Sequence, residues 1–293
     1  MHSRDFSNLF FTVSQKHIDK HYYRPPLILW GDIHDSPLNY DGLNSLVPFL
    51  DEHGYNCFGL ENDYTLDYQA TAKLLENYLK HSNKILNQFA KVKQPILKEH
   101  AKLISDSEKD VLAKTQLNLL LEKTNQTGWD YQGLDLPSSE NKEENNFLGS
   151  KLHKSSESMG EQITKSYLKD EKGMVAIMGI AHVIEVCELL ARSLEYNKAT
   201  ILFINIAKSN VDISNHLETI RWKFKKLDKV NGINFKCKMF EPGENTENEI
   251  KKFIQENMGV RLIKSIAIKK LNIAQKTEEK NIFKEMPRIR MKK

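Results

Sequence analysis

Residues 174–182 read Met-Val-Ala-Ile-Met-Gly-Ile-Ala-His, and this stretch is the clearest guide to the fold of the chain. Its first five residues are all apolar. A continuous apolar run, rather than an alternating one, is typical of a strand that is covered on both faces. Five further runs have a similar character, and most of them are also continuous. They are Leu27–Trp30, Asn56–Leu60, Trp129–Leu134, Ala199–Ile206 and Ile233–Phe240.

Amphipathic helical patterns lie between these runs. Apolar residues recur at helical spacing over 43–50 and 183–194, and Ile213–Leu227 is a third candidate helix. Gly54 follows the first pattern as a C-cap. Strands that alternate with helices indicate an α/β fold with crossover connections. We therefore predict a mostly parallel central sheet flanked by helices.

One connection is longer than a crossover requires. Residues 64–127, between the second and third strands, read as helix, and Pro95 separates the two expected helices Leu66–Phe89 and Ile96–Lys123. We interpret this segment as a helical insertion. An insertion in this place either walls a site or adds scaffold, and the pattern leaves both interpretations open.

The 293 residues (34.0 kDa) suffice for one large domain, which we place at residues 1–260. Residues 137–154 are polar and are predicted to form a mobile loop, with a helix from about Ser155 to Lys172. We expect residues 261–293 to form a basic C-terminal helix, over Ile263–Ile273, and a tail.

Charge is divided unevenly between these parts. Residues 261–293 hold 11 basic and 3 acidic residues, a net charge of +8, whereas residues 1–260 hold 32 basic and 36 acidic residues, a net charge of −4. The basic tail can contact an anionic surface. Phe283 is its one aromatic residue, so we expect no specific nucleic-acid recognition. The acidic body is better suited to a cationic ligand.

The sequence also bears on the compartment. No stretch approaches the roughly 20 apolar residues of a membrane span, and residues 1–5 do not begin a cleavable signal. Cys57, Cys187 and Cys237 are an odd number without paired spacing, which favours a reducing compartment. We expect a protein without a transmembrane segment that is cytoplasmic, or secreted without a cleavable N-terminal signal.

A Gly-x-x-His motif occurs twice, each time directly after an expected strand. Gly31-Asp32-Ile33-His34 follows the first strand and Gly179-Ile180-Ala181-His182 the fourth. Ligands of open parallel sheets bind outside the carboxyl ends of the strands. Both histidines are therefore expected at one crevice. Glycine suits such positions because it permits a turn or a close approach.

Acidic residues end two more strands. Glu61 closes the second strand and Asp135 the third. Imidazole and carboxylate groups bind zinc, manganese or iron, and they also perform acid–base catalysis without a metal. His34, Glu61 and His182 are the candidate metal ligands, and the same three residues with Asp135 are the candidate catalytic residues. Asp135 is also well placed to cap a helix.

These motifs resemble a superfamily that joins the erythromycin esterase-like proteins, the ChaN-like haem-binding proteins and the TraB/TIKI group. The resemblance covers roughly residues 25–210 and rests on short motifs in the right order. The first motif is most similar to the ChaN-like branch. The four matching segments are Gly31–His34, Gly59-Leu60-Glu61, Gly133-Leu134-Asp135 and Gly179–His182.

The chain departs from this superfamily at several positions. Asp32 stands where most relatives have glutamate, and Asn39 and Tyr40 stand where ChaN-like proteins often have histidines. Relatives frequently have an arginine four residues before a methionine, in the helix ahead of the second Gly-x-x-His motif. Here Ser155 stands four residues before Met159, so this arginine is absent. The superfamily includes hydrolases with and without a metal requirement, and binding proteins, so the resemblance implies a site more firmly than a reaction.

The leading hypothesis is a hydrolase-like enzyme that cleaves an ester or peptide bond, metal-assisted, in a small-molecule or peptide substrate. The alternative is a non-catalytic haem- or metal-binding protein of the ChaN-like type. A third reading is a degenerate enzyme fold that serves as an interaction module. A bound cofactor is expected to contact Gly31, Asp32, Gly179 and Tyr40.

Overall fold

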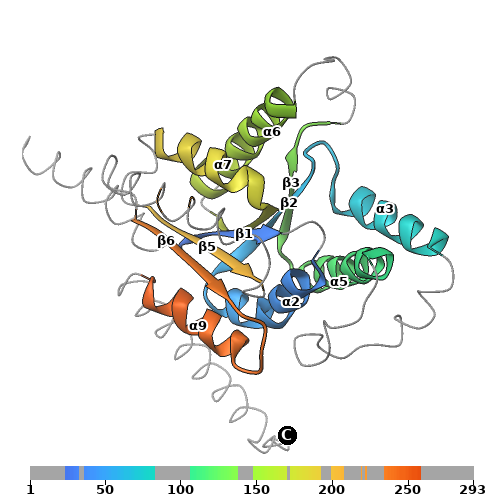
Figure 1. Ribbon diagram of the computed structural model, residues 1–293, viewed down its shortest axis with the longest axis horizontal. Coiled ribbons are helices and arrows are strands. Elements are labelled where there is room, and N and C mark those ends of the chain that lie inside the picture. The colour runs from blue at the N-terminus through green and yellow to red at the C-terminus, as the bar shows by residue number, and fades with distance from the viewer. Residues whose placement is uncertain are drawn as a thin grey trace, which may run out of the picture. The chain divides into compact units, whose positions relative to one another are not determined.

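The computed structural model describes most of the central part of the chain (Figure 1). Residues 24–257 form one compact unit. Three predicted features lie outside the described residues. They are His34, the C-terminal helix and tail, and the helix 213–227, of which residues 219 and 222 alone are described. The described residues are 24–32, 36–82, 106–137, 148–169, 172–192, 199–207, 219, 222 and 234–258.

The core of this unit is a six-stranded sheet in which every neighbouring pair is parallel. The bounds of each strand lie within three residues of those of a predicted apolar run, so the predicted α/β class is confirmed. The order across the sheet is β3-β2-β4-β1-β5-β6. The strands are β1 (Leu27–Asp32), β2 (Tyr55–Asp63), β3 (Asp130–Asp135), β4 (Gly173–Gly179), β5 (Thr200–Ile206) and β6 (Asn234–Phe240).

Helices cover both faces of the sheet, which explains why its strands read as continuous apolar runs. Helices α6 (Leu148–Ile163) and α7 (Ile180–Arg192) lie on one face, and α2 (Pro37–Glu52) and α9 (Thr246–Glu256) on the other (Figure 1). Helix α5 (Asp106–Gln126) packs beside α2. Among the helices that the structure describes, none combines the length and the apolar composition needed to cross a membrane.

The predicted insertion between β2 and β3 contains two helices in its described part. They are α3 (Tyr68–His81) and α5 (Asp106–Gln126). The first helix ends earlier than the sequence pattern indicated, at His81 with Ser82 as its C-cap. The predicted start of the second helix lies among residues 83–105, outside the described part. The two helices contact each other beside the carboxyl edge of β2.

The expected loop 137–154 and the helix after it need correction. Helix α6 already begins at Leu148 and ends at Ile163, and a π-helical segment, Thr164–Lys169, follows it. The half-buried Leu152 lines a cavity, so this polar stretch has an apolar contact that supports a helix. Residues 138–147 lie outside the described part of the chain.

The strand order creates a switch point between β1 and β4. The chain leaves β1 toward α2 on one face and leaves the adjacent β4 toward α7 on the opposite face (Figure 1). Asp32 and Gly179 are paired in the β1–β4 register, so both strands end at the same level. A crevice between diverging connections is the usual ligand site of such sheets.

The three cysteines are free thiols. Cys57 and Cys187 are buried and Cys237 is half-buried. Burial, with smaller effects from Cys237 and Glu188, raises the pKa of the Cys187 thiol well above its ordinary value. This thiol is therefore protonated at neutral pH and poorly nucleophilic.

Gly133 provides a test of the close packing at the edge of β3. A Cβ atom on Gly133 would lie 2.3 Å from the backbone oxygen of Asp63, on the neighbouring strand. Since backbone must move to relieve this contact, we expect Gly133→Ala to lower the free energy of unfolding by about 1–3 kcal/mol. Urea denaturation measures this change.

Gly160 in α6 is the matched control. An added Cβ there would meet Leu189 at 3.5 Å, an ordinary van der Waals distance. Gly160→Ala is expected to leave the free energy of unfolding unchanged or to raise it by up to about 1 kcal/mol, because alanine is the better helix former. Equal losses in both variants would contradict the close approach of β2 and β3.

Candidate active site

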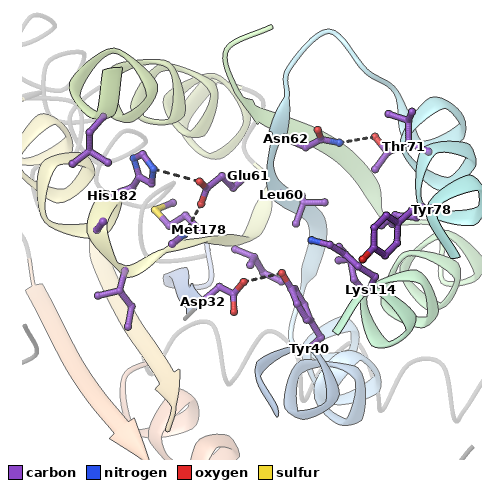
Figure 2. Close-up of a pocket in the computed structure, with 18 residues that line it drawn as sticks. Asp32, Tyr40, Leu60, Glu61, Asn62, Thr71, Tyr78, Lys114, Met178 and His182 are labelled. Atoms are coloured by element: carbon purple, nitrogen blue, oxygen red, sulfur yellow. Dashed lines mark hydrogen bonds and ion pairs between the residues drawn. The ribbon is translucent and has the colours of Figure 1, made fainter. Parts of the chain in front are cut away.

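A cavity of about 800 Å³ opens at the carboxyl edge of β1, β2 and β4 (Figure 2). Its size is that of small-molecule sites. The sheet and the first turns of α2 and α7 form one side, and α3 and α5 of the insertion form the other. The lining residues are Asp32, Tyr40, Leu60, Glu61, Asn62, Thr71, Leu74, Leu75, Tyr78, Lys114, Leu117, Leu152, Ile177, Met178, Gly179, Ile180, Ala181 and His182.

Glu61 and His182 form the central polar pair of the cavity. The Nε2 atom of His182 lies 3.3 Å from Oε1 of Glu61, and the second carboxylate oxygen, Oε2, accepts a hydrogen bond of 2.5 Å from the backbone N–H of Gly179. The imidazole is 11% exposed and the carboxylate 31%. The sequence analysis predicted that these two side chains share one edge of the sheet, and they are in direct contact.

Ser156 of α6 completes the environment of the imidazole. Its Oγ lies 3.0 Å from Nδ1 of His182 and donates its own proton to the backbone oxygen of Leu152. A hydroxyl has one proton, so while Oγ donates to Leu152 it can only accept from Nδ1–H, and Glu61 can accept from Nε2–H. This arrangement of partners favours the imidazolium form of His182.

The electrostatic surroundings favour the same protonation state. Burial lowers the pKa of His182, but the hydrogen bond to Glu61, the charge of Glu61 and the charges of Asp135 and Glu185 outweigh burial. The pKa therefore lies above its ordinary value of 6.5. His182 is thus a buried acid with an adjacent carboxylate, as general acid–base chemistry requires.

Asp32 and Tyr40 form a second polar pair in the cavity. The Tyr40 hydroxyl donates to Oδ2 of Asp32 at 2.8 Å, and the backbone N–H of Ser36 donates to Oδ1 at 3.3 Å. Both side chains are buried. Asp32, one of the expected cofactor contacts, therefore connects the end of β1 to the first turn of α2.

The remaining predicted residues have different places. Gly179 lines the cavity, whereas Gly31 does not line it and has the Phe203 ring where a Cβ would be, at 2.6 Å. Asp135 also stays outside the lining; its Oδ1 accepts from Ser155 at 2.5 Å and from the N–H of Leu136 at 2.7 Å. Asp135 thereby holds the turn of α6 that presents the adjacent Ser156 to His182.

The described residues supply two of the three expected metal ligands. Glu61 and His182 face each other, but no group of three or more His, Cys, Asp or Glu side chains that could hold a metal occurs within the described ranges. His34, the third expected ligand, lies outside them. The described side chains alone thus do not fit a metal centre.

Several cavity residues had no signal in the sequence. Ser156 is a serine within a helix, and Thr71, Tyr78 and Lys114 lie on helices whose polar faces look solvated. The sequence of the insertion is polar throughout, and its pattern does not indicate which turns of the two helices face the sheet. The contact between α3 and α5 determines which turns do so, and it joins residues far apart in the sequence.

Comparisons with known proteins give little guidance. No protein-family model and no curated protein matches the chain. A solved structure described as "Crystal structure of bacterial protein toxins" matches at 18% identity with a TM-score of 0.35, over 68% of this chain. The present chain spans 37% of that chain. A likeness at this level assigns neither a fold nor a function.

The raised pKa of His182 predicts the effect of removing its partner. In Glu61→Gln, burial continues to lower the pKa while the largest opposing effects are lost, so we expect the imidazole pKa to fall below that in the wild type. Titration of the ring nitrogens by ¹⁵N NMR measures it. Glu188→Gln, on the same helix as His182, is the control and should leave this pKa unchanged.

The same pKa fixes the pH dependence of stability. A group whose pKa is raised by folding stabilises the folded state fully at pH values below its ordinary pKa, which is 6.5 for this imidazole. This contribution is lost as the pH rises through the folded-state pKa. His182→Gln should therefore cost more unfolding free energy at pH 6 than at pH 9. An equal cost at both pH values would mean that the imidazole is neutral in the folded protein.

Proposed function

We propose that the chain is a hydrolase that cleaves an ester or peptide bond by acid–base catalysis at Glu61 and His182. The observation that carries the proposal is the hydrogen-bonded series Gly179 N–H, Glu61, His182 and Ser156 beside a cavity of substrate size. The partners on both sides hold the carboxylate and the imidazole in fixed orientations. Preorganised groups of this kind are what general acid–base catalysis needs.

The two groups have complementary roles in this scheme. Glu61 accepts a proton from water while the water oxygen forms its bond to the carbonyl carbon. His182 donates its Nε2 proton to the leaving oxygen or nitrogen as the bond from that atom to carbon breaks. Transfer of the proton from Glu61 to His182 then restores both groups, so that one water is consumed and no other reactant is needed.

The surrounding groups position this pair. The Gly179 amide directs one Glu61 oxygen away from the imidazole, and Ser156 fixes the ring plane through Nδ1. Asp135 acts at a distance, through Ser155 on the same turn of α6. The Asp32–Tyr40 pair is the second polar pair that lines the cavity.

The resemblance to the erythromycin esterase-like superfamily is part of this proposal. Its support here is positional: Glu61 and His182 follow strand ends at one cavity, Asp135 lies next to it, and Asp32 stands in the cavity at the end of β1. Asp32 keeps a carboxylate where most relatives have glutamate. Its bond to Tyr40 gives the shorter side chain a fixed place.

The haem-binding alternative has less support from the geometry. The hydroxyl of Tyr40 is committed to Asp32, and the ring is 3% exposed. The Nε2 atom of His182 faces Glu61. Both candidate iron ligands would have to give up these bonds, so this donor set does not fit haem as it stands. A Soret shift on titration with haemin that disappears in Tyr40→Phe would overturn this preference.

The catalytic proposal predicts loss of hydrolysis in two variants. His182→Gln and Glu61→Gln should each lower kcat/KM by about 10²-fold or more, since each removes one proton-transfer group. The substrates are a panel of p-nitrophenyl esters and fluorogenic peptides. Ser156→Ala should have a smaller effect, because Ser156 orients the ring without meeting substrate.

His153→Gln is the matched control for these variants. His153 is also a histidine of this helical layer with a glutamate partner, but it is 56% exposed and does not line the cavity. It should retain wild-type activity. If the two pair variants fold and hydrolyse every substrate as fast as the wild type, the enzyme proposal is wrong, and the use of this fold as an interaction module becomes the better reading.

A metal-assisted form of the hydrolase needs His34 beside Glu61 and His182. Zinc, manganese or iron held by these ligands would lower the pKa of bound water and polarise the carbonyl. For this form, elemental analysis of protein purified without chelator should find one equivalent of metal, lost in both His34→Ala and His182→Ala. Full activity in metal-free protein would leave the acid–base scheme as the complete mechanism.

A further inference from the structure

Apolar side chains line the cavity from the sheet and from the helical insertion. Leu60 and Ile177 are register partners at the ends of β2 and β4, and Leu75 and Leu117 belong to α3 and α5. Leu60 directly precedes Glu61 in the chain, and Figure 2 shows its side chain on the side of Glu61 toward α3 and α5. An apolar surface therefore begins beside the acid–base pair and continues toward the insertion.

Two exposed apolar side chains on α3 belong to the same wall. Leu74 is 54% exposed, Tyr78 is 40% exposed one helical turn later, and both line the cavity. Among the described residues four large apolar side chains are exposed, so half of them lie at this one cavity. Apolar surface that is exposed in a concave site is typical of a surface that a ligand covers.

The polar groups on the insertion side have partners within the protein. Asn62 donates from Nδ2 to Oγ1 of Thr71 at 3.2 Å, and Thr71 donates to the hydroxyl of Tyr131 at 3.1 Å. The hydroxyl of Tyr78 donates to Asp110. A ligand on this side does not have to supply polar groups of its own to satisfy them, and it gains free energy by burying apolar surface.

The charges of the described lining cancel. With His182 protonated, the two acids, Asp32 and Glu61, balance the two bases, His182 and Lys114. Asp32 accepts a hydrogen bond from Tyr40, and Glu61 lies against His182. Lys114 also has a partner within the protein. Since none of these four charged groups requires a counter-ion from a ligand, the lining favours a neutral ligand over an anion or a cation.

We propose that the substrate of this site is a neutral ester or amide that carries an extended apolar group. The bond to be cleaved lies at Glu61 and His182, and the apolar group extends past Leu60 toward the leucines of α3 and α5. The inference names the substrate class of the hydrolase proposed above and rests on that function for the cleavage. Its binding part, the preference of the cavity for a neutral apolar chain, does not depend on catalysis.

NMR titration of the full chain, labelled with ¹³C in its leucine methyl groups, tests the binding part. The probes are octan-1-ol, butan-1-ol, octanoate and octylamine. Octan-1-ol is expected to bind about 100-fold more tightly than butan-1-ol, since each buried methylene contributes about fourfold in affinity. It should also bind about fivefold or more tightly than octanoate and octylamine, because each of these brings a charge that the lining does not balance.

A matched pair of leucine substitutions tests whether the cavity wall holds the chain. Leu74→Ser should weaken the binding of octan-1-ol by about fivefold, the share expected when a ligand covers about half of one leucine side chain. Leu119→Ser, on α5, removes a leucine that is 40% exposed and does not line the cavity, and it should bind as the wild type does. Thermal unfolding of each variant by circular dichroism verifies that the fold is kept.

The outcomes separate this inference from the hydrolase proposal. Equal affinities for octan-1-ol and butan-1-ol, tighter binding of octanoate or octylamine, or equal losses in Leu74→Ser and Leu119→Ser would overturn the inference even if p-nitrophenyl esters are hydrolysed. Binding of octan-1-ol that depends on Leu74, without any hydrolysis that depends on His182, would support the inference and overturn the enzyme proposal.

Discussion

The site depends on one hydrogen bond between strand ends. The backbone N–H of Gly179, at the end of β4, donates to Oε2 of Glu61 on the adjacent β2. With one carboxylate oxygen fixed to the sheet, the other is directed to His182 in the first turn of α7. The rigidity of a parallel sheet is thereby passed on to two side chains that would otherwise have several rotamers. The strand order matters for the same reason, because it places β4 between β2 and β1.

The two motif glycines serve close approach rather than unusual backbone angles. Among the described glycines, positive φ occurs at Gly54 and Gly128 and not at Gly31 or Gly179. At Gly31 a Cβ would collide with the ring of Phe203, and at Gly179 it would come within 3.3 Å of a Glu61 oxygen. The first glycine permits core packing under β1, and the second leaves room for the carboxylate. Of the two roles expected for these glycines, a turn or a close approach, the structure therefore shows the close approach.

The sequence was informative where a residue's environment follows from its own strand. Apolar runs, most of them continuous, predicted the six described strands, and position after a strand predicted that Glu61 and His182 share an edge. The same reasoning placed Asp135 near the site but not its contact with Ser155, because that contact depends on how α6 packs. Ser156 and Lys114 could not be predicted for a similar reason. Both lie on helices, and which face of a helix meets the sheet is decided by contacts between distant segments.

In the proposed function, chemistry and recognition would occupy different parts of the chain. The sheet and the turns that leave it carry the acid–base pair, while the insertion carries Lys114 and much of the apolar wall. Sequence change in α3 or α5 can therefore alter which ligand fits without moving Glu61 or His182. The same division explains why overall charge is a poor guide to the ligand. Residues 1–260 have a net charge of −4, whereas the described lining of the cavity combines two acids, Asp32 and Glu61, with two bases, His182 and Lys114, so the net charge of the chain does not give the charge of the cavity.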